Sequence, residues 1–482
     1  MSSLITALNA GKTSLLTNQK SIEIIGNNIA NVNTPGYSRQ TAVLTEIPSV
    51  TFGDFFVGQG VTVSNVSRDY SSFITKQLQD KTVEFGEETG RSAPMTELQR
   101  TFSVSEDNLS AKITSFFDAW QQLAANPSGQ VERDTVLQQG QLLGTAFNDT
   151  NKSLDNIVNN LNTQVVAGVD DLNAKLSQIA KLNDRIQQVE VSGQTENSAR
   201  DQRDLLVKDL SEKLGVQTYS DGQGMLCLQL PGGLPLVQGN QAMTIKTVTT
   251  GADMKLQLVV AGHPVDISND NLGGEFKGML DVRDNLISGL RSNLDTLATD
   301  LTKAVNDVHS QGYYTDPTTG LAVAASTDPV TGLPNQGGLF FNNLAGPPVM
   351  ANASRHVEVA ITDTRKIAAA GQNTAAAGDN QNALLIAQLG NSHQVSGTTD
   401  TFDGYYSQMV SDVGIEANRN NLALTGAKDA TTQLQNLRDG YSGVSLEEEM
   451  VNLMQYQRGF QSSAKFLATV DEMMTSLLQV KQ

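Results

Sequence analysis

The 482-residue sequence contains a single cysteine, Cys227, and only 5% aromatic residues. One cysteine excludes an intramolecular disulfide framework and a cysteine-rich metal site. Cys227 lies in an alternating apolar run, so we expect it to be a small buried side chain in a strand. The fold must therefore be held by non-covalent packing.

Long apolar runs and an excess of positive charge are also missing. No stretch approaches the roughly 20 consecutive apolar residues of a membrane-spanning helix, so we expect no membrane insertion. The formal net charge is -18, which argues against a nucleic-acid partner because phosphates require a basic surface. Residues 1–25 lack both a basic start and an unbroken apolar segment, so no cleaved signal peptide is expected.

The motifs of catalysis and cofactor binding are absent as well. The sequence has no Gly-x-Ser-x-Gly, no Gly-x-x-x-x-Gly-Lys-Ser/Thr phosphate loop and no dinucleotide fingerprint. None of the histidines has metal-ligand spacing, and we interpret all four as incidental surface or loop residues: His263, His309, His356 and His393. We interpret Glu447-Glu448-Glu449 as solvated charge in a first helical turn. We therefore predict no catalytic residue, no metal ligand and no cofactor, but a structural or binding role.

Two apolar heptad patterns stand out, one at each end of the chain. At the N-terminal end a large apolar side chain recurs every seven positions, as in a coiled-coil seam. These residues are Leu8, Leu15, Ile22 and Ile29. At the C-terminal end the same spacing is kept by Leu446, Leu453, Phe460, Leu467 and Met474. An amphipathic helix must bury its apolar face, so we expect the ends to pair with each other, with neighbouring copies, or with both.

The first heptad pattern ends in an asparagine-rich turn. Pro35 biases Thr34 away from the helical region, Gly36 permits a positive φ, and asparagine favours turns and caps. The helix should therefore stop near residue 30. We assign the turn to Asn27, Asn31, Asn33, Pro35, Gly36 and Tyr37.

Helical spacing fills most of the middle of the chain. It predicts a very long helix over 131–191, which needs partner helices along most of its length. The candidates for these partners are 276–312 and 402–440.

Shorter helices are expected before this long one. One should begin at Ser67 and be interrupted or restarted at Pro94. Its spacing places five residues on one face: Tyr70, Phe73, Ile74, Gln77 and Leu78. Ser105 or Asn108 can cap the helix that follows.

Period-two alternation predicts β structure in the remaining segments. Residues 216–267 contain three alternating runs separated by glycine and proline, which indicates an inserted β domain. Residues 355–361 are expected to return one strand to that domain. Residues 41–66 suit extended pieces or a small hairpin, and the Gly/Pro-rich residues 313–338 suit a loop or flap.

These patterns predict a mainly α protein with an inserted β domain. It would have terminal coiled-coil helices, a long, discontinuous, rod-like helical bundle and one outer β domain. The predicted domains are an inner terminal domain (1–40 and 442–482), a helical domain (41–215, 276–312 and 366–441), an outer β domain (216–275 and 339–365) and a loop or flap (313–338).

The stretch from Asn27 to Gln40 resembles a signature shared by bacterial flagellar rod, hook and hook-associated proteins. It reads Asn-Asn-Ile-Ala-Asn-Val-Asn-Thr-Pro-Gly-Tyr-Ser-Arg-Gln. Three further segments are similar to the hook-associated protein 1, or FlgK, family of the hook-filament junction. These segments are residues 61–78, residues 201–216, and residues 442–449 together with the C-terminal heptad pattern. The resemblance covers both termini and the segments with helical spacing, and it is weakest over residues 217–365.

The resemblance implies an axial structural protein of the flagellum, exported through the flagellar type III apparatus without a cleaved signal peptide and therefore extracellular. Copies would form a ring at the hook-filament junction, between the hook protein and a second hook-associated junction protein. An export chaperone would cover the C-terminal helix beforehand. The terminal helices would be disordered in the monomer and pack into an inner tube through the two heptad patterns, and the asparagine-rich turn would lead to the next layer.

Two alternatives stay open at this point. A coiled-coil surface adhesin or adaptor with a ligand-binding β domain would carry the same terminal heptads and bundle, and only the Asn-Thr-Pro-Gly-Tyr signature separates it from a flagellar protein. An enzyme carried on the outer domain would need a metal or nucleophile constellation within 217–365, where His263 and His356 are isolated.

Overall fold

A computed structural model describes residues 2–52, 55–103, 108–222, 225–250, 253–316, 321–325, 338–344, 352–374, 378–392, 395 and 397–480. The chain forms two compact units. Unit 1 comprises Met1–Glu88, Val166–Lys277 and Thr425–Gln482, and unit 2 comprises Thr89–Val165 and Gly278–Leu424.

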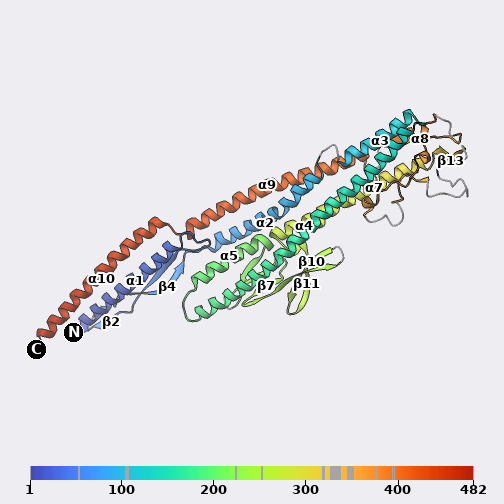
Figure 1. Cartoon of the computed structure of the whole chain (residues 1–482). Coiled ribbons are helices and arrows are strands. Elements are labelled where there is room, and N and C mark those ends of the chain that lie inside the picture. Colours follow the sequence, from blue (N-terminus) through green and yellow to red (C-terminus); the bar gives the residue numbers. More distant parts are fainter. Residues whose placement is uncertain are drawn as a thin grey trace. The chain divides into compact units, whose positions relative to one another are not determined.

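Long helices make up most of both units, and strands are inserted between them, as the sequence predicts (Figure 1). The α-helices are α1 (Ser2–Ala30), α2 (Ser72–Thr101), α3 (Leu109–Ala125), α4 (Gln130–Glu190), α5 (Asn197–Leu214), α6 (Gly274–Asp281), α7 (Ser288–His309), α8 (Gln381–Leu389), α9 (Phe402–Ser442) and α10 (Leu446–Val480). A π-helical turn, Val282–Ile287, joins α6 to α7.

The strongest helix predictions are confirmed. The expected end near residue 30 is the end of α1, and the expected helix over 131–191 is α4. Asn108 caps α3, because its side chain accepts the backbone N–H of Ala111 at 2.9 Å. Ser105 lies outside the described residues.

The predictions for α2 are partly wrong. The helix begins at Ser72 and not at Ser67, because Ser67 and Arg68 belong to strand β4 (Val61–Arg68). Of the predicted face, Phe73 is 70% exposed, whereas Leu78 is 5% exposed. Pro94 does not interrupt the helix, whose next turn buries Met95 and Leu98; this packing offsets the hydrogen bond that proline removes.

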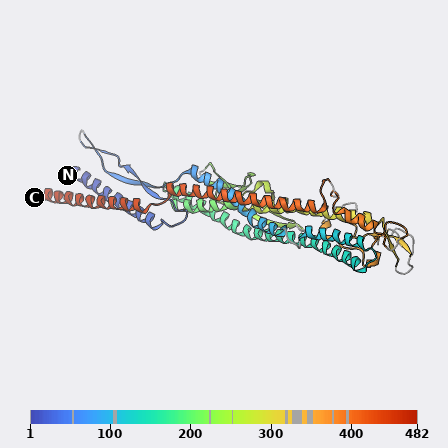
Figure 2. The ribbon, with the colours of Figure 1, turned by 90° about the horizontal axis from the view of Figure 1, so that it is seen from above.

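In unit 1, α1 packs against α10 and against a long β-hairpin. The hairpin pairs β1 (Gln40–Glu46) with β4 in antiparallel register and carries a shorter antiparallel pair, β2 (Val50–Phe52) with β3 (Phe55–Val57). Figure 2 shows this hairpin beside α1. The expectation of extended pieces or a hairpin over 41–66 is confirmed.

The inserted β region of unit 1 forms two antiparallel sheets. One has the order β5-β6-β7-β8 and the other β11-β10-β9. The strands are β5 (Gln217–Ser220), β6 (Leu226–Gln229), β7 (Pro235–Gln238), β8 (Gln241–Ala242), β9 (Thr244–Thr250), β10 (Asp253–Val260) and β11 (His263–Ile267). Asn183 of α4 donates to the Leu226 and Gly239 carbonyls at 2.8 and 2.7 Å, which ties the first sheet to the helix. Cys227 is a buried free thiol in β6, as expected.

Unit 2 is centred on buried aromatic side chains of α3 and of the segment around Phe340. Trp120, Phe116, Phe340 and Phe341 are all inaccessible to solvent, and their rings pack at centroid distances such as 5.4 Å between Trp120 and Phe340. Asn306 of α7 fixes this segment, because its side chain accepts the backbone N–H groups of Phe340 and Phe341 at 2.9 Å.

The predicted strand over 355–361 is wrong. Ala353–His356 form a 3-10 turn, and the pairing of Phe341 with Val359 is an isolated bridge. These residues bond to α4 and α7 instead of to the sheets; Ser354, for example, accepts from Asn151 at 2.6 Å and donates to Asp295 at 2.6 Å.

The predicted loop or flap over 313–338 contains two short paired strands. These are β12 (Tyr313–Thr315) and β13 (Ala322–Ala324), while residues 317–320 and 326–337 of that prediction lie outside the described residues. The division into inner, helical and outer domains stays a prediction.

His309 is not the incidental surface residue that its sequence context indicates. It is fully buried, its Nε2 accepts the backbone N–H of Ala368 at 3.0 Å, and its Nδ1 therefore carries the proton and donates to the Gly338 carbonyl at 2.9 Å. Burial lowers the pKa of His309 to about 4, against the smaller opposing effect of the Gly338 hydrogen bond. His263 and His356 are exposed, as expected, and His393 lies outside the described residues.

The buried His309 predicts a pH dependence of stability. The unfolded chain binds a proton near pH 6.5 and the folded chain only near pH 4, so the contribution of neutral His309 is complete above pH 6.5 and is lost as the pH falls toward 4, by at most about 3 kcal/mol. Urea unfolding followed by fluorescence of Trp120, the chain's single tryptophan, reports on this core. The wild type should lose more stability than His309→Gln between about pH 7.5 and pH 5.

The matched control is His263→Gln, which removes an exposed histidine. Its unfolding curves should follow those of the wild type at every pH. The prediction would be contradicted if the free energy of unfolding depended on pH equally in the wild type and in His309→Gln.

Candidate assembly interface

Much of the contact between α1 and α10 is made through small and polar residues, although Leu467 and Phe466 of α10 lie against Gly11. On α1 the small and polar residues recur at alternating steps of three and four, which places them on one helix face. This face contains Gly11, Ser14, Asn18, Ser21, Ile25 and Asn28. On α10 it meets Gly459 and Ser463, so we call this contact the small-residue seam.

Two glycines allow the helices to approach closely at the small-residue seam. A Cβ on Gly11 would lie 2.9 Å from the Leu467 side chain, and one on Gly459 would lie 2.7 Å from Oδ1 of Asn18. The hydroxyl groups of Ser14 and Ser463 hydrogen-bond at 2.8 Å. Such polar contacts fix the register of two helices more than they add stability.

The residues predicted from the apolar heptads lie beside this seam, except for Leu467, which lies against Gly11. Leu8, Leu15, Ile22 and Ile29 on α1, and Leu453, Phe460, Leu467 and Met474 on α10, are all half-buried, and Leu446 is 48% exposed. The helix pair therefore leaves part of both apolar patterns accessible. The seam itself follows a heptad of small residues, a signal that hydrophobic periodicity does not register.

The asparagine-rich turn forms immediately after α1. Asn31 donates to the Asn27 carbonyl at 3.0 Å and accepts the Thr34 hydroxyl at 3.1 Å. Gly36 has φ +80°, a left-handed conformation that favours glycine, and its carbonyl accepts Arg438 of α9 at 2.8 Å. Asn33 and Pro35 are exposed, whereas Tyr37 turns back toward α1.

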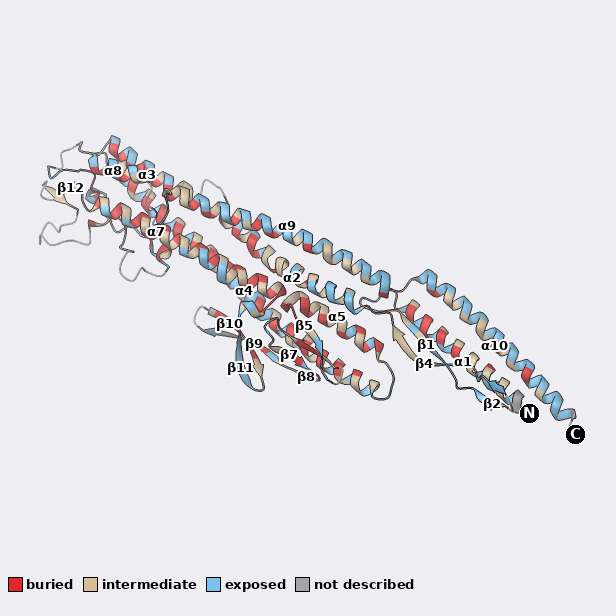
Figure 3. Ribbon diagram, turned by 180° about the vertical axis from the view of Figure 1, so that it is seen from behind, coloured by how far each residue is buried: buried red, intermediate tan, exposed pale blue. Residues whose placement is uncertain are grey.

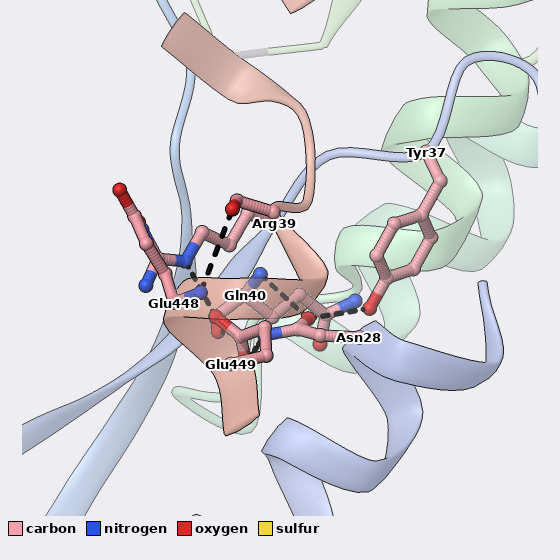
Figure 4. Close-up of polar contacts among 7 residues, drawn as sticks. Asn28, Tyr37, Arg39, Gln40, Glu448 and Glu449 are labelled. Carbon is pink, nitrogen blue, oxygen red and sulfur yellow. Dashed lines mark hydrogen bonds and ion pairs between the residues drawn. The ribbon is translucent and has the colours of Figure 1, made fainter. Parts of the chain in front are cut away.

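Asn28 uses all of its hydrogen-bonding capacity where the two chain ends meet (Figure 4). Its Oδ1 accepts the Tyr37 hydroxyl at 2.9 Å and the Gln40 N–H at 3.0 Å. Its Nδ2 donates to the Gln40 carbonyl at 2.9 Å and to Oε2 of Glu449 at 3.0 Å. The side chain is only 1% exposed, so each of these bonds replaces a contact with water.

Glu449 is the C-terminal partner in this network. Its other oxygen, Oε1, accepts a hydrogen bond from Nε of Arg39 at 2.8 Å, while Nη1 of Arg39 forms an ion pair with Glu448 at 3.1 Å. Glu449 is 1% exposed, so the interpretation of all three glutamates as solvated charge is wrong for this one. Glu447 and Glu448 are exposed, as expected.

A second charged cluster connects the turn to α5. The backbone N–H of Ser38 donates to Asp201 at 2.9 Å, and Arg68 of β4 pairs with Asp201 and Asp204, both at 2.7 Å. Burial first, and then the negative charges of Asp201 and Glu449, raise the pKa of Tyr37 to about 12. Its hydroxyl therefore stays protonated and can donate to Asn28 at neutral pH.

The chemistry available here is packing and hydrogen bonding. Within the part of the chain that the structure describes, no group of three or more His, Cys, Asp or Glu side chains could hold a metal ion. None of the described helices has the length and apolarity to cross a membrane.

Comparisons with known proteins match all of these segments. A model of the flagellar hook-associated protein FlgK helical domain matches residues 95–323. Two models of flagellar basal body rod proteins match the chain ends: the C-terminal model of the FlgEFG proteins over 440–480 and the rod protein model over 8–37.

Relatives match along the whole chain. The flagellar hook-associated protein 1 of Escherichia coli (strain K12) is 27% identical over 100% of both chains, and that of Bacillus subtilis (strain 168) is 26% identical over 99% of this chain and 98% of its own. Among solved structures, the flagellar hook junction protein FlgK from Burkholderia pseudomallei has a similar fold, with a TM-score of 0.63 and 17% identity over 77% of this chain and 100% of its own.

The Asn28 network predicts a large effect of a small substitution. Asn28→Ala leaves the buried Glu449 carboxylate, the Tyr37 hydroxyl and both backbone groups of Gln40 without this partner, which should destabilise the junction of the two chain ends by about 2–4 kcal/mol. Hydrogen-deuterium exchange of peptides covering 22–46 and 442–455 should then accelerate.

Asn27→Ala is the matched control. Asn27 is exposed and its side chain hydrogen-bonds only locally, to Asn31 at 2.6 Å. The free energy of local opening, calculated from the exchange rates, should therefore change by less than about 0.5 kcal/mol. Similar exchange in both variants would show that the network does not hold the ends together.

Proposed function

The chain belongs to the FlgK family of flagellar hook-associated proteins, and on that premise we propose that it builds the junction between hook and filament through its paired terminal helices. It is a structural protein of the bacterial flagellum. The family is not an enzyme family. The alternative of a surface adhesin or adaptor has no support in the comparisons.

The accessible apolar surface of the terminal helices carries this proposal. Large apolar side chains of α10 are between 46% and 58% exposed: Leu446, Met450, Val451, Met454, Phe466, Met473, Leu477 and Leu478. Burying one such side chain completely contributes about 1.5–3 kcal/mol. A pair of helices cannot cover this surface alone, and packing of several copies into a tube covers it.

The comparisons support the choice of these helices. Both rod-protein models match the chain ends, over 8–37 and 440–480, which are the segments that form most of α1 and α10. Elements shared with rod proteins are suited to the contacts that all axial proteins make. We therefore assign self-assembly to Leu8, Leu15, Ile22 and Ile29 on α1 and to Leu446, Leu453, Phe460, Leu467 and Met474 on α10.

Association with other axial components of the flagellum follows from the family. We further propose that copies form a ring, with the hook protein on one side and a second hook-associated junction protein on the other. Before assembly, an export chaperone covers the exposed apolar face of α10. The protein reaches the outside through the flagellar type III apparatus without a cleaved signal peptide.

Charges introduced into the half-buried heptad positions test the assembly role. Leu453→Asp with Phe460→Asp should abolish incorporation at the junction, because carboxylates cannot be buried between copies without partners. Unit 2 should keep its unfolding transition, followed by Trp120 fluorescence. Incorporation is measured as the amount of protein retained in purified hook-basal-body preparations.

Ile415→Asp with Leu422→Asp is the control pair. These residues have the same seven-residue spacing, lie on α9 within unit 2, and are 61% and 69% exposed. This variant should be incorporated normally. Normal filament growth in the Leu453→Asp, Phe460→Asp variant would contradict the assembly role of α10.

Limited proteolysis of the monomer gives a further prediction. The small-residue seam buries few large apolar side chains, so its free ends should open most easily. Cleavage should begin within 2–20 and 460–480 and slow down toward the Asn28 network, while the core around Trp120 resists. Equal resistance of the terminal helices and this core would show that assembly is not needed to order them.

A further inference from the structure

The β-hairpin and α10 pack on α1 through different side chains. Thr13 and Thr17 of α1 donate to the hairpin carbonyls of Gln59 and Val61 at 3.2 and 3.1 Å. Ser14 and Asn18 face α10 at the small-residue seam. The three elements form one module, in which the hairpin and the far side of α10 are two separate outer surfaces.

The end of the hairpin is strongly apolar and exposed. Phe55 and Phe56 of β3 are 75% and 77% exposed, and Val57 and Val50 beside them are 39% and 47% exposed. The strand pairing places Phe56 opposite Thr51 and Val57 opposite Val50. Neighbouring exposed phenylalanines are a feature of interaction sites and not of a solvated hairpin.

The far side of α10 presents a second apolar surface with basic residues in it. Met450, Val451 and Met454 are 49%, 58% and 49% exposed, and the exposed Arg458 and Lys465 follow on the same helix face at steps of four and seven. Figure 3 shows α10 as largely exposed along its length. We call these five residues the α10 outer face.

The two surfaces carry charged side chains of opposite sign. Glu46 is the one charged residue among the described hairpin residues 40–52 and 55–66, whereas Arg458 and Lys465 lie on the α10 outer face between Glu447 and Glu472. Opposite charges on two apolar surfaces favour one mutual orientation and one partner.

We propose that the hairpin end with Phe55 and Phe56 packs against the α10 outer face of a neighbouring copy of this chain. The inference deepens the proposed function, because it rests on copies assembling through the terminal module. Each copy would offer its hairpin to one neighbour and its α10 to another. Such a contact between two different surfaces repeats from copy to copy and generates a ring or a helical row.

Site-specific photo-cross-linking tests the partner surface. A chain with p-benzoylphenylalanine in place of Phe56 is assembled into flagella, irradiated in purified hook-basal bodies and mapped by mass spectrometry, with a mixture of isotope-labelled and unlabelled copies. The expected product joins residue 56 of one copy to a peptide within 446–480 of another. Cross-links to the hook protein, to another protein or to another segment overturn the proposal, and so does an assembled chain without cross-links.

Phe55→Asp with Phe56→Asp provides a second readout. Incorporation at the junction should fall about ten-fold or more, while exchange protection of the Asn28 network stays unchanged because these side chains are exposed. The control pair Ile415→Asp and Leu422→Asp should leave incorporation unchanged. Wild-type incorporation of the Phe55/Phe56 variant overturns the proposal.

The outcomes separate this inference from the proposed function. Absence of the wild-type protein from hook-basal bodies means that the proposed function fails. Presence of the wild type, with cross-links from residue 56 that map outside α10, leaves that function intact and removes only the hairpin contact.

Discussion

The buried carboxylate of Glu449 is the contact on which the terminal module depends. A charge that is 1% exposed persists only when hydrogen bonds and an opposite charge surround it. Asn28 and Arg39 supply both, from the other end of the chain. The asparagine-rich turn is therefore more than a helix stop, because it presents the groups that make the burial of this carboxylate tolerable. The turn, the first strand and the last helix form one unit.

The sequence predicts the elements of this fold well where local periodicity decides the outcome. The ends of α1 and α4, the cap at Asn108 and the strand around Cys227 follow from spacing and turn chemistry alone. The failures have a common cause, which is tertiary contact over long sequence distances. His309 is buried by α3 and by the segment around Phe340, and residues 353–361 bond to helices instead of extending a sheet.

The contact between α1 and α10 also depends on tertiary packing that the sequence pattern does not predict. Hydrophobic spacing identifies Leu453 and Phe460 as part of a seam, but the contact within the chain follows Gly11, Ser14 and Ser463. Small and polar residues give a close and well-registered approach with little hydrophobic stabilisation. This separation of roles leaves part of both apolar patterns accessible. Sequence spacing finds apolar residues that remain partly accessible, such as Leu453 and Phe460, and only the structure finds the small residues that pair within the chain.

The sequence distance between Asn28 and Glu449 has a consequence for how the terminal module forms. These partners are 421 residues apart, and α10 follows all the other described elements in the sequence. A chain that lacks α10 has no Glu449 carboxylate to accept from Asn28 and Arg39, whatever the state of its middle. The terminal module therefore forms only in a chain that carries both α1 with its turn and α10.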